Sequence, residues 1–261
     1  MTPSHYVVKT RGNITYHKLL DFCRCQTLYR LKYVDEAMEE QDKDVLTFGS
    51  AFDCYRESRE KFDNDYEVVA RRNKDSETVK FKTQLTQGMW EAIQALDGEY
   101  NRNKLTQKQE LIQAKVVARL NYMDKYPLIC EIDKMVKYGE QEIIVDDKTT
   151  GSLTGYRSYL DRVEEYLDQL TFYQFVYEGN FGKILPGALH FVSKDPVPKT
   201  LFLYAEAEKL LARRPQLLDK LDRMIEAMEN GLYESSDRAK CLECEAYGIC
   251  PFAVQEEYVI L

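Results

Sequence analysis

The chain of 261 residues is 44% hydrophobic, which is enough to bury one large core or two small ones. Its formal net charge of −8 excludes a global basic field that would by itself indicate a nucleic-acid partner, although a local basic groove is compatible with it. No run approaches the ~18–20 apolar residues of a membrane span, and the N-terminal sequence lacks the pattern of a secretory signal, so we expect no membrane partner and no export.

The first predicted helices span residues 14–33, where one helix runs into a second. Thr15 is suited to be the N-cap, and a buried apolar face begins at Leu19. Cys23 and Cys25 are two positions apart, so on a helix they point in different directions and do not easily bind one metal ion together. At most one of them is expected to be a distant metal ligand.

Residues 36–44 form a charged, solvated connection, after which Gly49 opens a helix that carries Asp53. Residues 64–80 are irregular apart from a short predicted strand at residues 66–69.

Two more helices are predicted before the centre of the chain, at residues 89–96 and 104–124. Apolar residues at spacings of three, four and seven positions indicate the second of them: Leu105, Ile112, Val116, Leu120 and Met123. Pro127 ends this helix.

The central stretch, residues 128–150, predicts a β-hairpin because two short apolar runs flank a turn at residues 138–140. Side chains alternate along a strand, so Asp146 and Lys148 share one face and Asp147 lies on the other.

Asp133 ends the first run of this hairpin, one strand away from Asp146 and Lys148. Two carboxylates and a lysine that converge at strand ends can hold a hard divalent cation and direct a water molecule at a phosphodiester. From local sequence alone, the alternative is a hairpin decorated with solvated charges.

A patterned helix follows a glycine-bounded loop at residues 151–155 and is stopped by Gly179 and Gly182. Gln169 and Tyr173 are four positions apart on it, so both can reach a site beside the sheet.

The last elements are a strand at residues 188–192, a helical segment that starts near Leu201 and is interrupted before Pro215, and a long helix with apolar residues in register over 217–228. The order of elements predicts a mixed α/β (α+β) fold, in which helices pack on a small sheet.

Three cysteines lie close together near the C-terminus: Cys241, Cys244 and Cys250. Seven cysteines in a chain without an export signal indicate a reducing cytoplasm, where such a cluster is a candidate metal site. Tetrahedral zinc or a four-iron cluster needs four ligands, so one more is expected from the helix that holds Cys23 and Cys25. The alternative is three unligated thiols.

Taken in order, these features resemble the PD-(D/E)XK nucleases, specifically the RecB-like exonucleases that carry an iron–sulfur cluster. The resemblance rests on ITYHKLLDFCRCQTLYRLKY, FGSAFD, EID, VDDKTT, QLTFY and CLECEAYGICP, and it spans residues 14–251. The stretch from FGSAF through LTQKQELIQAK to DDKTT also resembles the phage RecE-like branch.

This resemblance implies a single nuclease domain over residues 1–261, built on a small mixed central β-sheet flanked by helices. Residues 45–195 are the implied nuclease core. Residues 14–35 and 200–261 are the implied helical part, in which a cysteine metal cluster joins the N- and C-terminal segments.

The resemblance also implies a metal-dependent DNA exonuclease that uses Mg²⁺ or Mn²⁺. The implied catalytic residues are Asp133, Asp146, Lys148, Gln169 and Tyr173, and the implied metal ligands are Asp53, Asp133, Asp146 and the backbone carbonyl of Asp147. Lys148 orients the attacking water, Gln169 steadies Lys148 or that water, and Tyr173 lines the DNA channel. The side chain of Asp147 is expected to be solvated.

The implied ligands of a [4Fe-4S] cluster are Cys25, Cys241, Cys244 and Cys250, with Zn²⁺ as the alternative at the same site. Cys54 and Cys130 are expected to be ordinary buried thiols.

Two positions depart from the family pattern: Asp53 replaces a metal-binding His, and Cys130 stands where the family has Gly. The Asp53 change and the acidic charge balance favour an alternative function, a catalytically decayed, metal-stapled DNA-binding or adaptor protein.

DNA is the expected partner, in a groove of cations and stacking rings. Candidate cations are Arg24, Arg30, Lys32, Arg71, Arg72 and Lys74. The chain has no phosphate-binding motor loop, so any motor would be a separate helicase or recombinase chain; an oligomer is also open.

Overall fold

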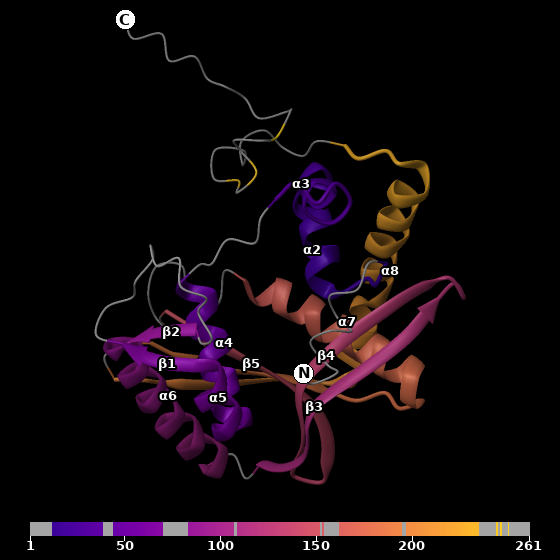
Figure 1. Ribbon diagram of the computed structural model, residues 1–261. Coiled ribbons are helices and arrows are strands. Elements are labelled where there is room, and N and C mark those ends of the chain that lie inside the picture. The colour runs from indigo at the N-terminus through magenta and orange to yellow at the C-terminus, as the bar shows by residue number, and fades with distance from the viewer. Residues whose placement is uncertain are drawn as a thin grey trace, which may run out of the picture.

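The computed structural model describes residues 12–38, 44–69, 83–106, 109–151, 153, 162–194, 197–234, 244, 246 and 250. Its centre is a five-stranded sheet in the order β3-β4-β5-β6-β7 (Figure 1). The strands are β3 (Gln109–Tyr122), β4 (Tyr126–Tyr138), β5 (Gln141–Thr150), β6 (Gly187–Ser193) and β7 (Thr200–Ala205). The β5–β6 pair is parallel and the other neighbours are antiparallel, so the sheet is mixed.

Helix α7 (Val163–Phe181) covers one face of this sheet. Its residues Phe172 and Val176 share a buried cluster with Ile132 and Ile144 of the sheet. Helix α8 (Ala207–Asn230) packs against α7, α2 (Tyr16–Arg24) packs against α8, and α3 (Gln26–Tyr33) packs on α2, so that helices from the two ends of the chain stand together in Figure 1.

The other helices form a second group: α4 (Asp44–Glu57), α5 (Arg59–Asp65) and α6 (Gln87–Thr106), with a small parallel sheet of β1 (Tyr66–Val69) and β2 (Thr83–Thr86) (Figure 1). These elements share their own buried apolar cluster, to which the five-stranded sheet contributes Val192 among the described residues. The second group is therefore a separate layer with a narrow apolar connection to the central sheet.

The central hairpin is confirmed: β4 and β5 pair across a turn in which Gly139 has φ of +62°. The strands expected at residues 66–69 and 188–192 correspond to β1 and β6. Thr15 caps α2 by accepting a hydrogen bond from the backbone N–H of Lys18, as expected.

The helix predicted over residues 104–124 is wrong for most of its length, because residues 109–122 form β3. The apolar residues have helical spacing, but burial in this segment alternates with the two-residue period of a strand. Val116 and Ala118 are buried, and Val117 and Arg119 are more exposed. Pairing along the whole of β4 supplies the backbone hydrogen bonds that fix the strand.

Two further expectations are corrected. The segment from Leu201 is strand β7 rather than helix, and α8 continues through Pro215 without interruption. An interior proline costs a helix about 3 kcal/mol. The buried face of α8 extends across it, from Leu210 to Leu221 and beyond, and this packing outweighs the loss. In addition, α4 begins at Asp44, so Gly49 lies inside that helix rather than at its start.

The predicted division into a core and a cluster-binding part stays a prediction. Within the described part of the chain, no helix combines the length and the apolar character needed to cross a bilayer.

Docking of α7 on β3 depends on a close approach at Gly179. A Cβ at this position would lie 2.5–3.0 Å from three side-chain atoms of Leu120. We therefore expect Gly179→Ala to lower the free energy of unfolding by about 1–2 kcal/mol in denaturant titrations.

Gly98 of α6 is the matched control, because a Cβ there meets nothing within 4 Å. Gly98→Ala should stabilise the protein by about 0.5–1 kcal/mol through helix propensity. Equal effects of the two substitutions would contradict the close approach of α7.

Candidate active site

The acidic site lies where β4 and β5 separate. Their ladder runs from Tyr138 paired with Gln141 to Lys134 paired with Val145. Just beyond its end, the Asp133 carboxylate accepts a hydrogen bond from the backbone N–H of Asp147 (2.8 Å). The Asp133 side chain thus bonds a backbone N–H group that lies just past the last strand pair, and this hydrogen bond holds Asp133 beside β5.

Asp146 and Lys148 share the face of β5 that α7 covers. The Lys148 ammonium lies 2.7 Å from Asp146 Oδ2, and the Gln169 amide donates to Asp146 Oδ1 (3.3 Å) and to the Tyr173 hydroxyl (2.6 Å). Asp146 is 2% exposed, so this carboxylate depends on its protein partners for charge and hydrogen bonding. The predicted sharing of a face by Asp146 and Lys148 is confirmed.

Asp147 points to the opposite face and is buried in a network of cations. Both terminal nitrogens of Arg56 lie 3.1 Å from its Oδ2, and Lys134 Nζ lies 2.9 Å from its Oδ1. The Tyr100 hydroxyl donates to Oδ2 at 3.4 Å, and His190 Nδ1 lies 3.5 Å from Oδ1. The expectation of a solvated Asp147 side chain is therefore wrong.

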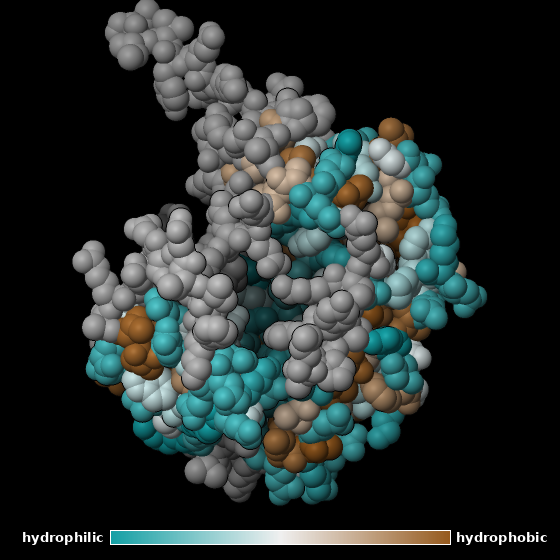
Figure 2. Space-filling model, viewed as in Figure 1, coloured by the Kyte–Doolittle hydropathy of each residue, from teal (hydrophilic) through white to brown (hydrophobic). Residues whose placement is uncertain are grey.

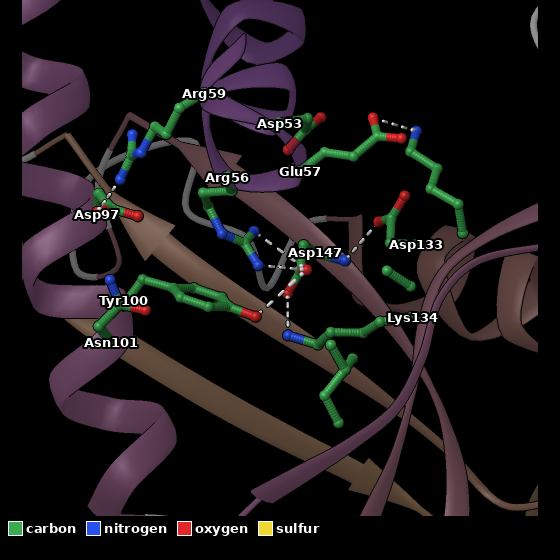
Figure 3. A pocket seen from close by; sticks show the side chains of 13 residues that line it. Asp53, Arg56, Glu57, Arg59, Asp97, Tyr100, Asn101, Asp133, Lys134 and Asp147 are labelled. Carbon is green, nitrogen blue, oxygen red and sulfur yellow. Dashed lines mark hydrogen bonds and ion pairs between the residues drawn. The ribbon is translucent and has the colours of Figure 1, made fainter. Parts of the chain in front are cut away.

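A pocket of about 260 Å³ opens on this second face (Figure 3). Asp53 and Glu57 of α4 and Asp133 of β4 stand at one side of it, and Arg56 reaches from α4 to Asp147. Figure 2 shows that the molecule is hollowed between the two helical groups and that the coloured side chains in the hollow are hydrophilic.

Asp133 and Lys134 both line this pocket although consecutive strand residues normally face opposite sides. The neighbouring strand β3 is irregular at the same level. The ladder pairs Ala114 with Lys134 and Val116 with Ile132, and the intervening Lys115 has φ of +50°. Such local distortions in strands redirect side chains and are common beside active sites.

The crowding of buried aspartates in the site shifts their pKa values. Burial and the neighbouring Asp146 raise the pKa of Asp133 well above its ordinary value. Burial and Asp147 raise the pKa of Asp53 to about 6. Burial opposes ionisation of Asp147 as well, but Arg56 and Lys134 outweigh it and hold the pKa of Asp147 well below its usual range.

The donor set suits a hard divalent cation, because Asp53, Asp133 and Asp146 offer carboxylate oxygens and their crowded charges would be relieved by one. Among the described residues, no three His, Cys, Asp or Glu side chains are already arranged as metal ligands. Lys148 balances the charge of Asp146, so an incoming cation would have to displace or share this contact.

Two expected roles change with the structure. Tyr173 is 7% exposed and packs in the core beneath α7, so the expectation that it lines a DNA channel is corrected. Gln169 contacts Asp146 rather than Lys148. A metal-binding role of the Asp147 carbonyl stays a prediction.

Four residues of the network were not predicted: Arg56, Tyr100, Lys134 and His190. Lys134 offered a signal, since a lysine inside the apolar run of β4 needs a buried partner. Arg56 lies three positions after Asp53 and so shares its side of the helix.

The candidate DNA-binding cations differ in their surroundings. Arg24 is half exposed and pairs with Glu165, whereas Lys32 is less exposed and pairs with Asp21. Arg71, Arg72 and Lys74 lie outside the described residues.

Cys25 separates α2 from α3, with an extended backbone at φ −162° and ψ 114°. Its sulfur caps α3 by accepting from the Leu28 N–H (3.4 Å). Cys25, Cys244 and Cys250 all pack against a small buried cluster formed by Leu28, Leu31 and Ala246. Cys241 lies outside the described residues.

Cys54 and Cys130 are buried, as expected for ordinary thiols. Burial raises the pKa of Cys130 to about 12, which keeps this thiol protonated.

Comparison with known proteins gives a family match and likenesses to solved structures. The profile of the PDDEXK-like domain of unknown function (DUF3799) matches residues 15–247. A candidate exonuclease from Eubacterium rectale is similar over 94% of this chain and 91% of its own, with 17% identity and a TM-score of 0.68. At this identity, the likeness shows a shared fold alone.

An alkaline exonuclease from Laribacter hongkongensis aligns over 87% of this chain and 95% of its own at 10% identity, but its TM-score of 0.37 is too low to support an argument. No curated protein sequence matches the chain significantly.

The raised pKa of Asp53 predicts how its replacement changes stability. Between about pH 4 and pH 6 the folded protein retains a proton that the unfolded chain has lost, so the charged Asp53 costs stability above that window. Asp53→Asn should raise the free energy of unfolding of the metal-free protein by about 1–2 kcal/mol near neutral pH. Urea titrations across pH should show this gain shrinking below about pH 6.

A gain of the same size at pH 4 and at neutral pH would show that the charge of Asp53 is not its source.

Proposed function

Since the chain belongs to the PDDEXK-like family DUF3799, we propose that it is a divalent-metal-dependent deoxyribonuclease that hydrolyses phosphodiester bonds at DNA ends. The observation that carries the proposal is the Asp146–Lys148 pair, 2.7 Å apart, beside the Asp133 carboxylate on the next strand. This is the set of groups that phosphodiester hydrolysis needs at one place.

Asp133 and Asp146 would hold Mg²⁺ or Mn²⁺, with Asp53 completing the ligand set. When bound there, such an ion would supply a Lewis acid for the scissile phosphate and for a water molecule. Lys148, on the same side as Asp146, would donate to the water or to a phosphoryl oxygen and offset the negative charge that develops there. Gln169 orients the Asp146 carboxylate through its amide.

The DNA strand would reach the site from the hollow between the two helical groups (Figure 2). The pocket beside Asp133 contains four cationic side chains: Arg56, Arg59, Lys115 and Lys134. Each has an acidic partner within 3.1 Å, so the pocket is close to charge balance and does not attract phosphate strongly by itself. A bound metal ion would supply the excess positive charge.

The same chain is proposed to hold a [4Fe-4S] cluster, or alternatively Zn²⁺, on Cys25, Cys241, Cys244 and Cys250. The common packing of Cys25, Cys244 and Cys250 against the cluster of Leu28, Leu31 and Ala246 supports this proposal. It would fasten the C-terminal segment to the junction between α2 and α3.

We expect the purified protein to degrade end-labelled linear DNA in Mn²⁺ or Mg²⁺ and to lose this activity in EDTA. Asp146→Ala should abolish turnover, and Lys148→Ala should lower kcat at least about a hundredfold, because a positioned charge at the phosphoryl group is lost. Covalently closed circular DNA should stay intact.

Lys183→Ala is the matched control for Lys148→Ala, because Lys183 is a 61% exposed lysine paired with a surface glutamate. It should leave the rate unchanged. DNA binding without cleavage in either metal would instead support the decayed adaptor protein.

The cysteine proposal predicts a coloured protein after anaerobic purification, with stoichiometric iron and the visible absorption of an iron–sulfur cluster. Cys25→Ser and Cys250→Ser should remove both, whereas Cys23→Ser should keep them because Cys23 is exposed within α2. A colourless protein that contains zinc would select the alternative metal, and one with neither metal would refute the site.

A further inference from the structure

The buried carboxylate of Asp147 has no role in the hydrolysis described above, yet it is the most heavily partnered acidic group of the site. Its side chain is 6% exposed and contacts Arg56, Lys134 and Tyr100 from three different elements. It lies between Asp146 and Lys148 in sequence but points to the opposite face of β5. Because the desolvation of a buried ion pair can cancel its attraction, so many partners are weak evidence of a purely stabilising role.

Asp147 connects the elements that carry the three acidic residues of the site. Its backbone N–H holds the Asp133 carboxylate of β4, and its side chain holds Lys134, the next residue along that strand. Asp146 precedes it on β5. Arg56 ties it to α4, the helix that carries Asp53.

The connection to α4 matters because this helix packs largely on α5 and α6. Its apolar cluster receives Val192 from the five-stranded sheet, among the described residues. Asp53 and Arg56 are three positions apart and therefore lie on the same side of the helix. The Arg56–Asp147 ion pair thus fixes the segment of α4 that presents Asp53 to the sheet.

We propose that Asp147 and Arg56 form a positioning pair that holds Asp53, Asp133 and Asp146 at the separations needed to bind one divalent metal ion. The Asp147 carboxylate and the Arg56 guanidinium touch neither the metal nor the DNA; these two side chains act through the three carboxylates. This inference rests on the proposed metal-dependent function and assigns the residue between Asp146 and Lys148 a part in metal affinity.

Isothermal titration of Mn²⁺ into the purified full-length protein tests the pair directly. Asp147→Asn and Arg56→Met should raise the Kd for Mn²⁺ by about 10–100-fold, the usual effect of losing a group that orients metal ligands. Arg56→Lys, which keeps the charge but not the two-nitrogen contact, should have a smaller effect. The Mn²⁺ concentration for half-maximal cleavage should shift by the same factor.

The control is Asp21→Asn. Asp21 is also a buried carboxylate that accepts from a lysine (Lys32, 3.1 Å) and a tyrosine (Tyr33, 2.8 Å), but it joins α2 to α3. This variant should lose stability and keep wild-type affinity for Mn²⁺. Unchanged Mn²⁺ affinity in folded Arg56→Met and Asp147→Asn would overturn the proposal, as would an equal loss in Asp21→Asn.

Hydrogen exchange of the metal-free proteins provides a second measurement. Peptides from α4 should exchange faster in Arg56→Met and Asp147→Asn than in the wild type, and those from α8 should not. If the wild type itself binds no Mn²⁺, the proposed function fails together with the metal role of the pair. If the wild type binds Mn²⁺ and α4 exchanges at the wild-type rate in both variants, the positioning pair alone fails.

Discussion

The structure is organised around a concentration of buried negative charge at the point where β4 and β5 part. Asp53, Asp133, Asp146 and Asp147 come together there from a helix and two strands. Their charges repel, and water is too far removed to screen them well. The fold balances two of the four with cations, Lys148 for Asp146 and Arg56 with Lys134 for Asp147, and leaves Asp53 and Asp133 with raised pKa values.

This division of charge follows the two faces of β5. On the α7 face, Asp146 is held by Lys148 and Gln169, which are groups able to take part in hydrolysis. On the other face, Asp147 joins α4 to the sheet. Alternation along one short strand therefore places Asp146 with Lys148 on one face and the Asp147 side chain on the other, although the two aspartates are neighbours in sequence.

The local backbone of several segments differs from the one that the sequence pattern predicts. The apolar positions between Leu105 and Met123 fit a helix, and only the long pairing of β3 with β4 decides for a strand. The distortion at Lys115 is likewise a property of the strand pair, and it lies beside the pocket that Asp133 and Lys134 both line. Pro215 predicted an interruption of the helix, but α8 is continuous there because its buried face extends across the proline.

The sequence alone indicated the PD-(D/E)XK superfamily, and it determined the central hairpin, the shared face of Asp146 and Lys148, and the place of Asp133 on the neighbouring strand. These follow from a motif order and from a period of two, which are local properties of the chain. Only the tertiary structure decided that Asp147 is buried and which residues pair with it. Arg56, Tyr100 and His190 are 91, 47 and 43 positions away from Asp147 in the sequence. No local rule of secondary structure relates residues that are so far apart along the chain.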